Sequence, residues 1–474
     1  MQQEDKKELL RKIPSVDRLL NSSEIAELAS EYPRSLIVKA IHDVLDELRG
    51  SILSGDSSRN VIDLNVSPVT GLVAERLARL ARPSLRSVIN ATGVVVHTNL
   101  GRSILAERVL QNFRPLSGGY CNLEYDLNEG KRGSRYSHVE GILMELTGAE
   151  AATVVNNNAA AVYICLETLA KDREVVVSRG ELVEIGGSFR IPDVMRKSGA
   201  TMVEVGTTNK THLKDYEGVI GPETGMLLKV HRSNFQIVGF TEEVDRAQLS
   251  ELGRKYGIPV VEDLGSGCLI DLTKYGLLKE PTAGEVLEQG VDLVTFSGDK
   301  MLGGPQAGII LGKKDLVEAI RRNQLSRALR IDKLTLLALE ETLNIYRDER
   351  VALEEIPTLK MITQPYEDLK KKARRLLRLI GKPESRNFSV GATDGISRVG
   401  GGAWPLQELP SRLVTLVPAG LSAHQMEEWL RAQEPPIIVR VEDDKVHLDV
   451  RTIQENEMKK VAEALKTLSA FMNS

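Results

Sequence analysis

One lysine is distinguished by its position in the sequence. Lys300 follows an apolar run over residues 291–296 that predicts a buried strand, and the small polar turn Ser297-Gly298-Asp299 presents it. Glycines and a second apolar run, residues 308–311, come after it. At the end of a buried strand an amine is partly desolvated, which lowers its pKa and lets it act as nucleophile and base. The pattern therefore fits a lysine that forms a covalent bond to a carbonyl group. Taken alone, the same pattern would more commonly mark a surface lysine in a glycine-rich turn.

A carboxylate occupies the same kind of place in an earlier segment. Asp263 ends the predicted strand over residues 259–262 and precedes the small turn Leu264-Gly265-Ser266-Gly267. A carboxylate there can keep the pyridine nitrogen of pyridoxal 5′-phosphate protonated, so that the ring withdraws electrons from a substrate's α-carbon. An aspartate that only caps a turn is the alternative, and it becomes the weaker one beside Lys300.

A third polar group follows another predicted strand, residues 152–155. Asn156, Asn157 and Asn158 open a predicted helix there, where backbone N–H groups can bind a phosphate. The hydroxyl of Ser297 is a further ligand for the same phosphate. An asparagine-rich turn alone is a weak signal, because asparagine is common in loops. Taken in order, the phosphate turn, the aspartate and the lysine match the large domain of the fold-type I pyridoxal phosphate enzymes.

The elements that must position these groups alternate between strand and helix from about residue 88 onward. This alternation predicts an α/β fold with a mostly parallel sheet flanked by helices. Ligands of such sheets bind beyond the carboxyl ends of the strands, which is where the three polar groups fall. The predicted domains are a small helical domain over residues 1–65, a linker helix over 66–87, a cofactor-binding large domain over 88–345 and a small α+β domain over 346–474.

Size and composition narrow the class of protein. The 474 residues suffice for one large core and one or two smaller domains, and 42% hydrophobic and 27% charged residues are typical of a soluble globular protein. No apolar run approaches the roughly 20 residues of a membrane span, and the amino terminus lacks the apolar segment of a signal peptide. Three cysteines without metal-ligand spacing predict free thiols, no metal site and a reducing cytoplasm. The net charge of −4 argues against wholesale nucleic-acid coating, so we expect no DNA partner, while a local basic face stays possible.

Several long strings of residues resemble one enzyme family. They are residues 89–102, 177–187, 230–235, 262–267 and 297–304, and residues 11–20 resemble the amino-terminal domain of the same family. Over nearly its whole length the chain is similar to the bacterial selenocysteine synthases, the L-seryl-tRNA(Sec) selenium transferases. The resemblance implies a cytoplasmic, pyridoxal phosphate-dependent transferase whose amino-terminal domain binds the tRNA. It also implies a homodecamer, a pentamer of dimers, with active sites at the dimer interfaces.

The reaction that the resemblance implies replaces the serine hydroxyl of seryl-tRNA(Sec) with selenium from selenophosphate. Lys300 would remove the α-proton with the support of Asp263, and loss of water would give a dehydroalanyl intermediate to which the selenium donor adds. An anionic donor requires fixed cations, for which Arg102, Arg327 and Arg330 are the candidates. The last two would share one face of a helical turn, and guanidinium groups bind oxyanions in a bidentate manner. A solvated basic face is the alternative interpretation of this pair.

Four further residues carry weaker signals. His97 and His231 lie in the family strings, and a histidine often stacks on the pyridoxal ring, although either could be a histidine of the core. Arg135 and Tyr136 precede a predicted helix, and we expect them to reach the cofactor phosphate of a neighbouring subunit.

The sequence leaves two other functions open. A pyridoxal phosphate lyase that acts on a free amino acid or amino sugar acid would share the cofactor residues, but it would not need the amino-terminal domain. A catalytically idle tRNA-binding protein would keep that domain, but it would not need Lys300 and Asp263. The combination therefore favours a seryl-tRNA(Sec) selenium transferase.

Overall fold

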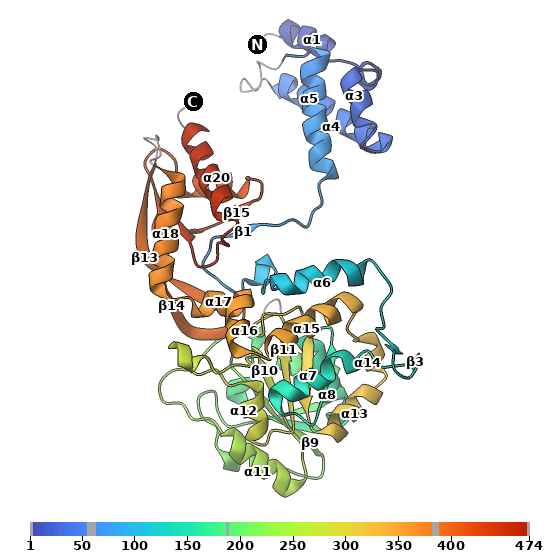
Figure 1. The fold of residues 1–474 in the computed structure, drawn as a ribbon, viewed down its shortest axis with the longest axis vertical. Helices are drawn as coiled ribbons and strands as arrows, with labels where there is room; N and C mark the ends of the chain where they lie inside the picture. The colour runs from blue at the N-terminus through green and yellow to red at the C-terminus, as the bar shows by residue number, and fades with distance from the viewer. Residues whose placement is uncertain (1–2, 55–62, 186–188, 382–387, 472–474) are drawn as a thin grey trace. The chain divides into compact units, whose positions relative to one another are not determined.

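The computed structural model of the protein describes residues 3–54, 63–185, 189–381 and 388–471. The chain divides into two units, Met1–Ser87 and Val88–Ser474, whose elements are labelled in Figure 1. Within the described ranges no helix has the length and apolar character needed to cross a membrane.

The first unit is helical. Its helices are α1 (Gln3–Lys12), α2 (Val16–Leu20), α3 (Ser23–Leu28), α4 (Arg34–Ser54) and α5 (Val66–Ala81). Serine hydroxyls start the two short helices, because Ser15 and Ser22 accept hydrogen bonds from backbone N–H groups in the first turns of α2 and α3. Buried residues at helical spacing on α4 and α5 form a shared core. Helix α5, which covers most of the segment expected to be a linker helix, thus packs within this unit.

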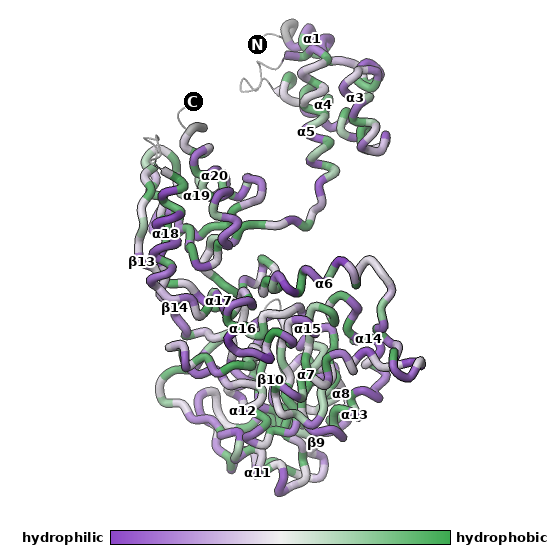
Figure 2. Tube along the Cα trace, in the orientation of Figure 1, coloured by the Kyte–Doolittle hydropathy of each residue, from purple (hydrophilic) through white to green (hydrophobic). Residues whose placement is uncertain are grey.

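The second unit is built on a seven-stranded sheet in which every strand except β12 runs parallel. In sheet order the strands are β4 (Ala151–Val155), β12 (Gly308–Gly312), β11 (Leu293–Ser297), β10 (Val260–Gly265), β9 (Thr224–Val230), β5 (Glu174–Ser178) and β8 (Thr201–Val205). Its central strands are buried apolar runs, as expected for a sheet that is covered on both faces. Figure 2 shows hydrophobic residues in this region and hydrophilic stretches on outer helices such as α18.

Helices cover both faces of this sheet. One face packs on α7 (Ser137–Thr147), α11 (Arg246–Tyr256), α12 (Ala283–Glu288) and α15 (Lys333–Ile345), and the other on α8 (Asn158–Ala170), α9 (Ile191–Lys197) and α13 (Lys314–Arg322). The alternation of side chains along each strand produces the two layers. Leu227 of β9 joins the first core, whereas its neighbours Met226 and Leu228 join the second.

A smaller α+β part completes the second unit. Its antiparallel sheet has the order β13 (Phe388–Gly400), β14 (Ala403–Pro418), β17 (Lys445–Asp449) and β16 (Arg440–Glu442), and α18 (Tyr366–Ile380), α19 (Ala423–Arg431) and α20 (Met458–Phe471) pack on it. The short strand β1 (Ile89–Asn90) pairs in parallel with β15 (Ile437–Ile438), so the start of this unit lies in the core of its carboxyl-terminal part. The mostly parallel sheet flanked by helices confirms the predicted α/β fold class.

Short elements connect these layers. They are η2 (Thr98–Leu100), α6 (Glu107–Ser117), β2 (Tyr125–Asp126), β3 (Lys131–Arg132), η3 (Arg179–Glu181), β6 (Glu184–Ile185), β7 (Phe189–Arg190), α10 (Leu213–Glu217), η4 (Leu272–Tyr275), α14 (Leu325–Ala328), α16 (Glu349–Glu355) and α17 (Pro357–Thr363).

Candidate active site

The carboxyl ends of β9, β10 and β11 border a cavity of about 610 Å³. Parallel neighbouring strands end at one edge of the sheet, so residues that are distant in sequence meet there. Among the sequence-predicted residues, the cavity is lined by Lys300, Asp263, Asn157, Asn158, Ser297, Arg102 and His231. Its other lining residues are Thr98, Asn99, Ala159, Val230, Ser233, Asn234, Gly265, Asp299, Gln306, Gly401 and Gly402.

Lys300 is buried just beyond β11, and the residue is only 5% exposed. Its Nζ lies 3.4 Å from the carbonyl oxygen of Gly402, in the turn between β13 and β14. Gly402 has a φ of +74°, and a Cβ at this position would lie 3.3 Å from Nζ, so a glycine permits the close approach. Burial lowers the pKa of Lys300, an effect that nearby Arg102 strengthens and nearby Asp263 opposes. The amine can therefore lose its proton more readily than a surface lysine.

Asp263 is buried on β10, next to the strand that leads to Lys300. Its Oδ1 accepts a hydrogen bond of 2.8 Å from the side-chain amide of Asn158 and one of 3.5 Å from the hydroxyl of Thr295. Burial raises the pKa of this carboxyl, and the hydrogen bond from Asn158 is the largest opposing effect. No arginine, lysine or histidine of the described ranges forms an ion pair with it. A cationic ring nitrogen beside Asp263 would therefore meet a carboxylate that has no ion-pair partner among the described residues.

The three asparagines of the turn before and at the start of α8 have different roles. Asn157 caps the helix, since its side chain accepts a hydrogen bond of 2.8 Å from the N–H of Ala160. Asn158 reaches Asp263, as described above, and Asn156 is exposed and lies outside the lining of the cavity. With Ser297 at the end of β11, Asn157, Asn158 and the helix N-terminus supply polar groups for a phosphate.

The three candidate arginines do not lie together. Arg102 lines the cavity, and its Nη1 donates a hydrogen bond of 2.7 Å to Oδ2 of Asp299, the residue before the lysine. Arg327 on α14 and Arg330 after it are exposed and do not line this cavity. Arg330 instead lies 3.6 Å from Oε1 of Glu124.

Arg135 and Tyr136 also lie outside the lining. Arg135 donates from its Nε to Glu124 at 2.9 Å and from its Nη1 to the backbone oxygen of Ile331. The guanidinium of Arg321 lies 5.6 Å from the centre of the Tyr136 ring, at cation–π distance. Within a single chain these two residues thus serve local packing.

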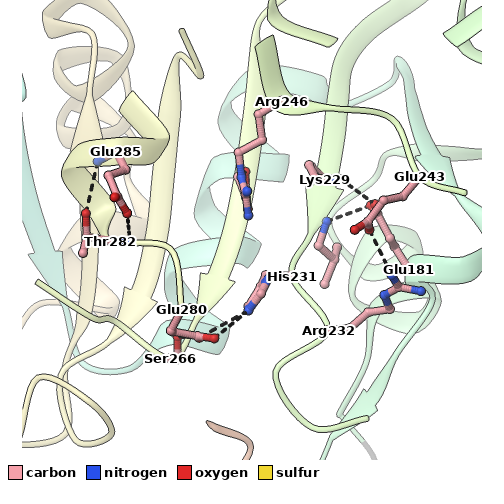
Figure 3. Close-up of polar contacts among 12 residues, drawn as sticks. Glu181, Lys229, His231, Arg232, Glu243, Arg246, Ser266, Glu280, Thr282 and Glu285 are labelled. Atoms are coloured by element: carbon pink, nitrogen blue, oxygen red, sulfur yellow. Dashed lines mark hydrogen bonds and ion pairs between the residues drawn. The ribbon is translucent and has the colours of Figure 1, made fainter. Parts of the chain in front are cut away.

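The two histidines differ in their surroundings. His97 accepts a hydrogen bond of 3.2 Å from the N–H of Asn99 at the start of η2, and burial lowers its pKa. His231 follows β9 and lines the cavity, with Nε2 at 3.2 Å from Oε1 of Glu280 (Figure 3). The buried Glu280 also accepts a hydrogen bond from Ser266. Sequence reasoning missed Glu280, because nothing near it in the chain indicates that its carboxylate is buried beside a histidine.

The residues of this cavity fit pyridoxal phosphate. Asn158, Ser233, Asn234 and Asp299 each carry a buried side-chain oxygen for which no hydrogen-bond partner is found within the described part of the chain. All four line the same cavity as the buried amine and the buried carboxylate. A ligand with a carbonyl carbon for the amine and a basic ring nitrogen for the carboxylate fits this set, and the unpartnered oxygens can accept hydrogen bonds from its donors or from those of the substrate.

Comparison with known proteins assigns the chain to one set of relatives. Residues 88–454 match the family model described as L-seryl-tRNA selenium transferase, and residues 10–49 match the model for the selenocysteine synthase N terminal domain. The L-seryl-tRNA(Sec) selenium transferase of Geobacter sulfurreducens is 51% identical over 462 residues, covering 98% of this chain and 100% of the relative. That of Clostridium botulinum (strain Loch Maree) is 52% identical over 464 residues, covering 98% and 99%. Among solved structures, D-glucosaminate-6-phosphate ammonia-lyase has a similar fold, with a TM-score of 0.53 and 21% identity over 82% of this chain and 97% of that chain.

Replacing Asp263 with asparagine should change how the stability of the cofactor-free protein depends on pH. Because burial raises the pKa of Asp263 in the folded state, the folded protein keeps a proton at pH values where the unfolded chain has lost it. The free energy of unfolding of the wild type should therefore fall as the pH rises from the ordinary aspartate range through the raised pKa. Urea unfolding at a series of pH values should show this fall in the wild type, and Asp263→Asn should lack it.

A partly exposed aspartate provides a control of opposite sign. Hydrogen bonds from Thr273 lower the pKa of Asp271 in the folded state to about 2. Its contribution to stability is therefore fully present above the ordinary aspartate pKa and is lost as the pH falls from there through the lowered pKa. Asp271→Asn should flatten the acid side of the same curve. An unchanged pH dependence in Asp263→Asn would show that this carboxyl is not held in a desolvated site.

Proposed function

The chain belongs to the L-seryl-tRNA selenium transferase family, and we propose that it uses pyridoxal 5′-phosphate and selenophosphate to convert L-seryl-tRNA(Sec) into L-selenocysteinyl-tRNA(Sec) in the cytoplasm. The family match and 51% identity over nearly the full chain support this transferase activity over a lyase acting on a free amino acid. The observation that carries the proposed chemistry is the buried Lys300, which shares one cavity with Asp263 and Arg102.

Lys300 is the residue that moves a proton. When bound, pyridoxal phosphate supplies a ring that stabilises negative charge at the α-carbon of the seryl group. Because burial lowers the pKa of Lys300, its Nζ loses a proton more readily than a surface lysine does, which favours the neutral amine that can take the α-proton. Asp263 would stabilise a positive charge at the ring nitrogen of the bound cofactor, because a buried carboxylate interacts strongly with a cation beside it. Lys300 would pass this proton to the departing β-hydroxyl, which leaves as water, so that the β-carbon becomes unsaturated. The selenium of selenophosphate would add to this β-carbon while the α-carbon takes up a proton, and water would then cleave the selenium–phosphorus bond and release phosphate.

Arg102 orients the selenium donor. Its bond to Asp299 fixes the guanidinium beside Lys300, while further N–H groups stay available for an oxyanion such as selenophosphate. Ser103 holds the same segment, since its hydroxyl donates to the backbone oxygens of Asp299 and Lys300 at 2.9 and 2.8 Å. Ser297 and the start of α8 bind the phosphate of the cofactor.

We assign Arg327 and Arg330 to a neighbouring subunit's site. Both are exposed and neither lines the cavity of its own chain. In a homo-oligomer, proposed as a decamer of five dimers, their side chains would complete the donor site of a partner chain, and Arg135 and Tyr136 would approach the same interface. His231 is held at the cavity wall by Glu280 and is the histidine placed to contact cofactor or substrate.

A reconstituted reaction tests the proposal. The purified protein with pyridoxal phosphate and selenophosphate should convert seryl-tRNA(Sec) and should leave seryl-tRNA of the ordinary serine type unchanged. Conversion of free serine or an amino sugar acid, with no reaction on seryl-tRNA(Sec), would support the lyase alternative instead.

Lys300 should carry the cofactor. Borohydride should fix the pyridoxal chromophore to the peptide that contains Lys300, because this amine is buried and its pKa is lowered. Lys300→Ala should abolish turnover and leave tRNA binding largely intact. Lys229 is the matched control, since it is also buried but forms an ion pair of 3.1 Å with Glu181. Label on Lys229 or on any lysine other than Lys300 would contradict the assignment.

The arginines should act on donor affinity. Losing one charge-assisted contact costs about 1.5–3 kcal/mol, so Arg102→Ala, Arg327→Ala and Arg330→Ala should each weaken selenophosphate binding by about one to two orders of magnitude. Arg→Lys should restore little, because an ammonium cannot reproduce the planar fork. Arg322→Ala, an exposed arginine on α13, is the control and should leave the donor dependence unchanged.

Mixed oligomers distinguish an arginine that completes the cavity of its own chain from one that completes the cavity of a partner chain. Subunits with Lys300→Ala and subunits with Arg330→Ala are inactive or weak alone. If Arg330 serves the partner's cavity, mixing them should restore activity, because a hybrid dimer then has one site with an intact lysine and an intact arginine. Without any restoration, Arg330 serves its own chain or none.

The first unit should be required for tRNA binding and not for cofactor binding. The family model for the selenocysteine synthase N terminal domain matches residues 10–49, which lie within this unit, whereas the cofactor residues lie in the second one. A protein that lacks residues 1–87 should still bind pyridoxal phosphate and should lose most of its affinity for tRNA(Sec), as measured by filter binding. Unchanged tRNA affinity after truncation would contradict this role.

A further inference from the structure

A second cavity, of about 740 Å³, lies beside the first one. The two cavities share Val230 and His231 as lining residues, so the end of β9 forms the wall between them. The other residues that line the second cavity are Lys229, Arg232, Gln236, Glu243, Val244, Asp245, Arg246, Leu278, Lys279, Glu280, Pro281, Glu285, Gln289, Trp404, Pro405 and Leu406.

The cations of the second cavity are matched by carboxylates. Figure 3 shows Lys229 directed at Glu181 and Arg232 close to Glu243, with ion-pair distances of 3.1 and 2.9 Å. Arg246 holds the fully buried Glu262 with two N–H groups, each at 2.8 Å from a carboxylate oxygen. Lys279 on the rim lies 3.0 Å from Asp271.

This pairing decides which ligands fit. Each of these cations is paired with a carboxylate, whereas the first cavity holds the Lys300 amine, for which no ion pair is found in the described part of the chain, beside Arg102. The second cavity is therefore the poorer site for free phosphate or for the selenium donor. The rim is partly apolar instead, with Leu278 53% and Leu406 51% exposed next to two prolines. The exposed amides of Gln236 and Gln289 add hydrogen-bonding groups. Such a mixture suits a neutral, partly apolar ligand that also forms hydrogen bonds, such as a nucleoside.

We propose that the second cavity binds the 3′-terminal nucleoside of the aminoacyl-tRNA, while the seryl group attached to it enters the Lys300 cavity past His231. The inference rests on the proposed function. Serine is joined to the terminal ribose by a single ester, so a seryl group at Lys300 places that nucleoside directly beside the reactive cavity. The second cavity has this position, and its volume lies in the range of ligand sites.

The His231 wall has a defined geometry. Nε2 of His231 lies 3.2 and 3.3 Å from the two oxygens of Glu280, and Ser266 at the end of β10 also donates to Glu280. The backbone N–H of His231 donates to the oxygen of Asp263 at 2.9 Å. The residue that separates nucleoside from reacting group is thereby tied to the strand that carries Asp263.

Two small probes test the inference in the cofactor-loaded full-length protein. One is 3′-(L-seryl)amino-3′-deoxyadenosine, which carries the nucleoside, and the other is L-serinamide, which lacks it. The change that each causes in the absorbance of the cofactor gives its affinity. The nucleoside probe should bind the wild type at least about tenfold more tightly. Equal affinities would overturn the inference.

Narrowing the cavity should remove this difference. Leu278→Trp and Leu406→Trp add bulk at exposed rim positions outside the proposed catalytic groups, so folding and the affinity for L-serinamide should stay unchanged, while the nucleoside probe should lose about tenfold in affinity. Val441→Trp, at a 43% exposed position on β16, is the matched control. Rim variants that bind the nucleoside probe as the wild type does would contradict the assignment.

A crosslink locates the nucleoside without any turnover. Transfer RNA whose terminal adenosine carries an azido group should label peptides of residues 278–289 or 404–406 on irradiation, and label elsewhere would place the nucleoside outside the second cavity. A failure of the proposed function looks different. In that case neither small probe would change the cofactor absorbance and seryl-tRNA(Sec) would not react, and the inference would fall with it.

Discussion

The burial of an amine and a carboxylate at the ends of neighbouring strands is the constraint on which this structure depends. Both groups lose hydration there, so burial lowers the pKa of Lys300 and raises that of Asp263. Each is tolerable only with polar neighbours in fixed places, and Asn158 at the start of α8 supplies the closest one for Asp263. The second polar neighbour is the hydroxyl of Thr295, which the parallel register of β10 and β11 sets opposite Asp263. The same contacts therefore hold together the sheet, the start of α8 and the site.

The same constraint explains the contact with the smaller part of the second unit. The turn between β13 and β14 contains three successive glycines, Gly400 to Gly402, all with positive φ. Side chains at the first two positions would collide with Val94 or Val96, since a Cβ on Gly400 would lie 2.3 Å from Val94 and one on Gly401 2.5 Å from the Val96 oxygen. A Cβ on Gly402 would lie in tight contact, 3.3 Å from Nζ of Lys300. The backbone of this turn lies close to the Lys300 amine and helps to keep it buried.

How far the sequence predicts the site depends on whether a residue sits at a strand end. Lys300, Asp263 and Ser297 share one cavity because the carboxyl ends of parallel strands meet, which the alternation of strand and helix already indicated. Contacts that depend on long-range packing were not predictable. Glu280 reaches His231 through a loop, β1 pairs with a strand almost 350 residues away, and α5 packs on α4. Local pattern carries no information about such partners.

The two cavities differ in how fully their polar and charged groups are paired within the chain, and this difference fits them for different parts of the substrate. Around Lys300, buried oxygens of Ser233 and Asp299 lack partners within the described ranges, so that cavity is set up to be completed by a ligand. Across the His231 wall, Lys229 and Arg246 are already held by Glu181 and Glu262. Groups that are satisfied within the chain exert little pull on charged ligands, and they also keep the wall rigid. A substrate that carries both a reacting group and a neutral recognition group can then be held across one wall, with the reactive charges reserved for the reacting end.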